Sequence, residues 1–95
     1  MTETTMVQAL AMLKVDLGIT TDAYNTRLEQ YLSAAEAEIA RQGAALDNSV
    51  GDLQLMVMYA AWMWRRRDTM EGMPRMLRYA LNNRIFSAKM GASDG

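Results

Sequence analysis

The sequence predicts an all-α protein, a small bundle of four helices, and three observations support this fold class. Its six glycines and one proline divide the chain into segments that each carry apolar residues at helical spacing. No stretch combines apolar–polar alternation with the turn residues of a β-hairpin. Of the 95 residues, 51% are hydrophobic, which is typical of a packed core. We expect a single domain over residues 1–95, with 91–95 as a disordered tail.

The expected helices span about residues 5–16, 22–42, 50–67 and 74–88. The first begins at a capping-box pattern, Thr5 and Gln8, and ends before Gly18. Thr21 or Asp22 caps the second, and the glycine that follows its last residue is a natural stop signal.

The third and fourth helices have start signals of their own. Ser49 and Asp52 form a capping pattern directly before an apolar run, Leu55 to Trp64. Because this third helix is apolar nearly all round, we place it at the centre of the bundle. Pro74 is well suited to the first position of the fourth helix.

The composition excludes many kinds of active site. The chain has no cysteine and no histidine, which removes thiolate metal sites, the commonest general base and the Ser-His-Asp arrangement. Small all-helical chorismate mutases need neither residue, but they interlock through one long first helix, which the breaks at Gly18 and Gly43 forbid. We therefore expect no enzyme, no catalytic residue, no metal site and no cofactor.

Two further absences bear on location. The longest apolar run has ten residues, about half of what a bilayer span needs. The first residues carry no basic segment of the kind that opens a secretory signal. We expect no membrane partner.

Charge is distributed unevenly along the chain. Residues 1–64 have a net charge of −5 and residues 65–95 have +4, which suits head-to-tail association but is equally compatible with a chance dipole. On the second helix, Glu29 and Glu36 lie on one flank of the apolar stripe, and Arg27 and Arg41 lie on the other. We expect these four residues to form contacts between neighbouring copies.

The fourth helix has two distinct faces. The face expected to join the core comprises Leu77, Ala80, Leu81, Ile85 and Ala88. The opposite face carries Arg75, Arg78, Tyr79, Asn82 and Phe86. Arginine and aromatic residues are enriched at protein interfaces, which favours a docking surface. In the alternative interpretation, the aromatic side chains cover an edge of the core and the arginines are simply solvated.

The basic last third of the chain also permits a second function, that of a small helical DNA-binding protein. Its basic residues are Arg65, Arg66, Arg67, Arg75, Arg78, Arg84 and Lys89. A helix-turn-helix needs a tight turn and polar outward side chains. The turn over 68–73 is long, and Tyr79 and Phe86 occupy the outward face.

Several segments in order carry a resemblance to a known family. They are Val7–Leu10, Lys14–Gly18, Asp22, Ala34–Ile39, Trp64–Asp68, Met73–Leu77 and Asn82–Arg84. Taken together, from Met6 to Lys89, the chain resembles the helical head-tail connector (adaptor, head-completion) proteins of long-tailed bacteriophages and prophages. Members of this family are often described as phage DNA-packaging proteins.

The resemblance implies a structural virion protein. Members form a ring, usually twelve-fold, below the portal, where the ring joins the DNA-filled head to the tail and extends the DNA channel. By analogy, the C-terminal helix docks on the portal protein, the bundle flanks contact neighbouring copies, and the next neck or head-tail stopper protein binds the ring. DNA would be at most the passing contents of the channel. The implied location is the virion neck, with the host cytoplasm during assembly.

Overall fold

A computed structural model describes residues 2–67 and 72–93 of the chain. It contains four α-helices, α1 (Glu3–Leu17), α2 (Asn25–Arg41), α3 (Val50–Arg66) and α4 (Arg75–Ser93), and the described residues form no strand. The predicted all-α, four-helix bundle is therefore confirmed. None of the helices in these two ranges is both long and apolar enough to cross a membrane.

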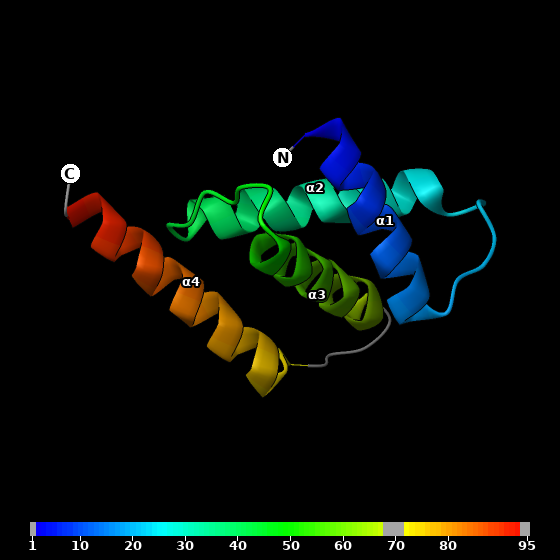
Figure 1. The fold of residues 1–95 in the computed structure, drawn as a ribbon. Helices are drawn as coiled ribbons and strands as arrows, with labels where there is room; N and C mark the ends of the chain where they lie inside the picture. The colour runs from blue at the N-terminus through cyan, green and yellow to red at the C-terminus, as the bar shows by residue number, and fades with distance from the viewer. Residues whose placement is uncertain (1, 68–71, 94–95) are drawn as a thin grey trace.

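The near-apolar helix α3 lies at the centre of the bundle, as its composition predicted. It packs against the other three helices, whereas α4 packs mainly on α3. Figure 1 shows α1 and α4 on opposite sides of α3, with α2 running behind α1. The residues of α3 that join the core are Asp52, Leu53, Leu55, Met56, Val57, Tyr59, Ala60, Ala61 and Trp64. A helix buried on most of its circumference can present only a narrow strip to solvent.

The first two helices begin at different residues from those predicted. The N-cap of α1 is Thr2, whose Oγ1 accepts from the backbone N–H of Thr5 at 3.2 Å, and Thr5 itself is buried inside the helix. Helix α2 begins at Asn25 with no side-chain cap, because Asp22 binds Lys14 at 2.8 Å instead. The capping signals at Thr5 and Asp22 were therefore wrong as helix starts. At Asp22 a competing partner takes the side chain that the local pattern assigned to a cap, whereas at Thr5 an earlier cap, Thr2, starts the helix before the predicted position.

The remaining boundaries follow the local signals more closely. Gly18 ends α1 with a φ of 70°, and Gly43 follows α2 with a φ of 118°, both in the left-handed region that favours glycine. Ser49 caps α3 by accepting from the backbone N–H of Asp52 at 3.3 Å. Pro74 precedes α4, and its carbonyl accepts the first helical hydrogen bond, from Arg78.

The C-terminal end of α4 differs from the expected disordered tail. Residues 91–93 continue the helix, while residues 94–95 lie outside the described residues. A single glycine in a helix costs only about 1 kcal/mol relative to alanine. Gly91 therefore does not act as a stop signal, and no proline follows it.

Candidate interaction surfaces

The outward side of α4 exposes every residue that the sequence assigned to docking. We call Arg75, Arg78, Tyr79, Asn82 and Phe86 the α4 outer face. Tyr79 is 68% exposed and Phe86 is 65% exposed, whereas Leu77 and Leu81 on the opposite side are buried. The aromatic side chains thus do not cover an edge of the core. The helical period alone separates the two faces, because the spacing 75, 78, 79, 82, 86 returns to the same side of a helix.

The α4 outer face combines apolar area with positive charge. A shallow depression of about 250 Å³ is lined by Arg75, Arg78, Tyr79, Asn82 and Asn83. Within the described ranges, neither arginine forms an ion pair with a carboxylate. Both guanidinium groups are therefore available to an acidic partner, and the tyrosine ring beside them adds contact area.

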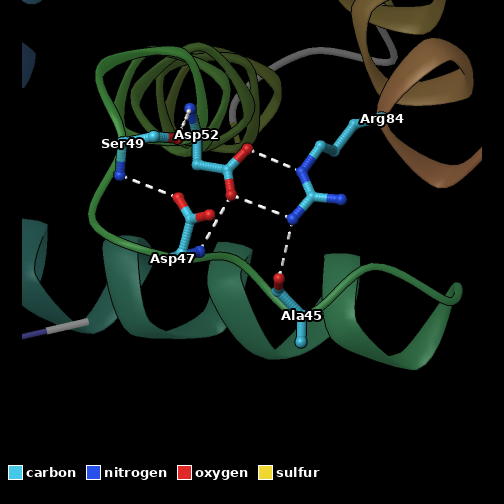
Figure 2. Close-up of polar contacts among 5 residues, drawn as sticks. All are labelled: Ala45, Asp47, Ser49, Asp52 and Arg84. Atoms are coloured by element: carbon cyan, nitrogen blue, oxygen red, sulfur yellow. Dashed lines mark hydrogen bonds and ion pairs between the residues drawn. The ribbon is translucent and has the colours of Figure 1, made fainter. Parts of the chain in front are cut away.

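A buried ion pair fixes α4, and with it the outer face, to the rest of the bundle. Arg84 donates to Asp52 from Nε to Oδ1 at 2.7 Å and from Nη2 to Oδ2 at 3.1 Å. The same Nη2 donates to the carbonyl oxygen of Ala45 at 2.9 Å, as Figure 2 shows. Asp52 is 4% exposed. One arginine thus connects α4 to both the start of α3 and the loop that follows α2.

The loop before α3 completes this network. Asp52 Oδ2 also accepts from the backbone N–H of Asp47 at 2.8 Å, and Asp47 Oδ1 accepts from the backbone N–H of Ser49 at 2.8 Å (Figure 2). Hydrogen bonds from the side chain and backbone of Ser49 lower the pKa of the Asp47 carboxyl, and Asp52 and Arg84 lower it further. A carboxylate stabilised in this way helps to hold the loop in one conformation.

This network predicts a measurable titration. We expect NMR to show Asp47 titrating below its ordinary pKa of 3.8. Its contribution to stability is then fully present above about pH 4 and is lost as the pH falls through the lowered pKa. Ser49→Ala should raise that pKa towards its ordinary value, whereas Ser33→Ala, at an exposed serine of α2, should leave it unchanged. An Asp47 titration that does not respond to Ser49→Ala would contradict the hydrogen-bonded loop.

Several basic residues of the last third are engaged within the chain. Arg84 belongs to the ion pair with Asp52, which the sequence did not predict because the two residues are 32 positions apart. Arg66 lies over the ring of Trp62 at 4.5 Å, and Arg67 lies over the ring of Trp64 at 3.8 Å. These contacts account for three of the seven residues that suggested a basic DNA-binding surface.

The four charged residues on the flanks of α2 differ in their exposure and in their contacts. Arg27 and Glu29 are exposed, whereas Glu36 is half-buried. Arg41 pairs with Glu38 on its own helix, and the hydrogen bond from Arg41 lowers the pKa of the Glu38 carboxyl. Their proposed contact between copies remains a prediction.

A second surface, which sequence reasoning missed, lies where α1 meets α2. We call it the α1–α2 groove, a hollow of about 240 Å³ lined by Glu3, Met6, Val7, Glu29 and Ser33. Val7 is 63% exposed, and Val15, further along α1, is 81% exposed. Apolar residues occur on several sides of α1, so periodicity alone does not identify the ones left uncovered. Val7, Ala11 and Val15, spaced four residues apart, form an exposed apolar stripe on α1, and this spacing could have indicated an uncovered face that includes the Val7 side of the groove.

The described residues include no group of three or more acidic side chains that could hold a metal ion. No protein-family model matches the chain, and searches of curated proteins and of solved structures returned no match.

Proposed function

We propose that this chain is a structural subunit of a bacteriophage head-tail connector, which assembles into a ring below the portal and joins the head to the tail. In this proposal it acts without catalysis or a cofactor. Its partners are other copies of itself, the portal protein and the next neck or head-tail stopper protein, and DNA only passes through the channel. The family resemblance suggests this role.

The observation that carries the proposal is the α4 outer face. Tyr79 and Phe86 are mostly exposed, and Arg75 and Arg78 lack ion-pair partners among the described residues. An aromatic and arginine surface of this kind is typical of the central part of protein interfaces. Because Arg84 binds both Asp52 and the Ala45 carbonyl, the surface is held in place before any partner binds. Preorganisation of this kind lowers the entropic cost of docking.

The size of the bundle supports an assembled state. A chain of 95 residues buries only about 60–65% of its unfolded surface on folding, so its core stabilises it modestly. Any partner that binds only the folded chain adds to this stability. The α4 outer face lies on α4 and the α1–α2 groove lies between α1 and α2, and α1 and α4 occupy opposite sides of α3 (Figure 1). Two separate surfaces allow one copy to bind two partners at the same time.

A double variant tests the proposal. Arg78→Ala combined with Phe86→Ala should abolish binding to the portal protein encoded by the same genome, because it removes one charge and one large aromatic group from the docking surface. Pull-down on immobilised portal measures the loss, and circular dichroism should show unchanged helical content.

The control is Val50→Ala combined with Gln54→Ala, two exposed positions on α3, which should bind the portal like the wild type. Native mass spectrometry provides the second readout, where a ring of many copies, alone or on the portal, is the expected result. A discrete dimer or a monomer that does not bind the portal would contradict the connector function.

A further inference from the structure

We propose that the α4 outer face of one copy binds the α1–α2 groove of a second copy of the same chain. This inference rests on the proposed function and deepens it, because it names the neighbouring copy as the occupant of the α4 outer face. The portal would then bind the assembled ring, and Arg78→Ala with Phe86→Ala would lose portal binding because the ring does not form. The portal protein, which the family resemblance assigns to that face, is the competing occupant.

The two surfaces are complementary in charge. On α4, Arg75 and Arg78 are exposed, and within the described part of the chain neither is paired with an acid. At the groove, Glu3 and Glu29 are also exposed and likewise have no basic partner among the described residues. Each surface therefore carries two charges of the sign that the other lacks. Pairing them across an interface would steer the two copies together and set their register.

The two surfaces also match in their apolar content. The groove is lined by Met6 and Val7 as well as by its two acids, and the α4 outer face exposes Tyr79 and Phe86 in addition to its two arginines. The hollow of about 240 Å³ has the volume of several water molecules, at about 30 Å³ each, which is room for an aromatic ring. Aromatic and arginine side chains buried near the centre of an interface are typical of hot spots.

The positions of the two surfaces allow both to be used at once. Helices α1 and α4 lie on opposite sides of α3, so one copy can give its α4 outer face to one neighbour and its groove to another (Figure 1). The two patches differ, which makes the contact heterologous. A heterologous contact generates a ring when its rotation closes. The same arrangement pairs two acids of residues 1–64, which have a net charge of −5, with two arginines of residues 65–95, which have a net charge of +4.

Charge reversal at one residue of each surface provides the test. Glu29→Arg and Arg78→Glu should each weaken self-association by about tenfold or more, because each places like charges against one another. Both positions are exposed, so neither change disturbs the core. Gln54→Arg, at an exposed position of α3, is the control that should associate like the wild type. Sedimentation velocity of the purified full chain, over a concentration series at low salt, measures the association.

The decisive sample is an equal mixture of the two single variants. In the mixture, the carboxylate introduced by Arg78→Glu can face the guanidinium introduced by Glu29→Arg. The unchanged Arg78 of one variant can likewise face the unchanged Glu29 of the other. Alternating copies then restore every contact, so the mixture should associate like the wild type although each variant alone does not. Raising the salt concentration should weaken association of the wild type and of the mixture alike.

The other outcomes overturn the inference in distinguishable ways. Single variants that associate like the wild type, or a mixture that does not recover, would exclude this pair of surfaces. If Arg78→Glu retains self-association but loses portal binding, the α4 outer face belongs to the portal, and the proposed function stands without the inference. A wild-type chain that stays monomeric at the highest soluble concentration but binds the portal leads to the same conclusion. A wild-type chain that neither self-associates nor binds the portal would overturn both the inference and the proposed function.

Discussion

Replacing Trp64 with alanine is expected to lower the free energy of unfolding by about 3–5 kcal/mol, a large loss for a single change in so small a domain. The indole is 8% exposed at the end of α3, where it joins that helix to α2. Its ring centroid lies 5.8 Å from that of Tyr24 and 5.6 Å from that of Tyr31, in edge-on geometry, and the Arg67 guanidinium lies over it at 3.8 Å. Such ring pairs contribute beyond simple burial.

Urea unfolding followed by far-UV circular dichroism measures this loss. A domain of this size loses about 4–8 °C in Tm per kcal/mol, so Trp64→Ala should melt well below the wild type. Trp64→Phe retains an aromatic ring against both tyrosines and should cost much less. Trp62→Ala is the matched control, because Trp62 is only half-buried. If Trp64→Ala and Trp62→Ala cost the same, the contacts between α2 and the end of α3 do not dominate stability.

Replacing Arg84 with alanine is expected to cost about 2–4 kcal/mol and to act mainly on α4. The change leaves the buried carboxylate of Asp52 without its charged partner, and an uncompensated buried charge is strongly destabilising. The side chain of Arg84 is 24% exposed, so the effect should fall below that of a fully buried pair. The change also removes the hydrogen bond to Ala45, one of the ties between α4 and the loop after α2.

Hydrogen exchange resolves where this stability is lost. Because α4 packs mainly on α3, its amides should lose protection in Arg84→Ala before those of α1 and α2 do. The double variant Asp52→Leu with Arg84→Met removes both charges and should recover part of the loss. Arg78→Ala, which removes an exposed arginine that pairs with no carboxylate among the described residues, is the control on the same helix and should leave exchange unchanged. A uniform loss of protection across all four helices would contradict an anchoring role for Arg84.

Local sequence signals predicted the helices because they depend on residues only a few positions apart. Gly18, Gly43 and Ser49 mark helix ends as predicted, because left-handed backbone and N-capping are properties of a single turn. The same kind of signal failed at Thr5 and Asp22. Asp22 binds Lys14, which lies eight positions earlier, and Thr5 lies buried behind the true cap at Thr2. A capping pattern therefore predicts a helix start only when no partner competes for its side chain and no earlier residue caps the helix.

The candidate surfaces also differ in how far the sequence predicts them. The α4 outer face follows from helical periodicity, because Tyr79 and Phe86 lie opposite Leu77 and Leu81 on one helix. The ion pair that holds this face in place was not predictable from the sequence. Its partners, Asp52 and Arg84, are brought together only by the packing of α4 on α3. The α1–α2 groove was not predictable either, since Glu3 and Glu29 belong to different helices.

The sequence by itself thus determined an all-α chain of four helices, the central place of α3, and the division of α4 into a buried and an exposed face. These features follow from backbone preferences and from apolar periodicity, which act within one or two helical turns. Only the tertiary structure decided which charges are paired, which apolar residues of α1 remain uncovered, and how α4 is held. Those depend on side chains from separate helices meeting at specific distances, and periodicity within one helix carries no information about the register between two.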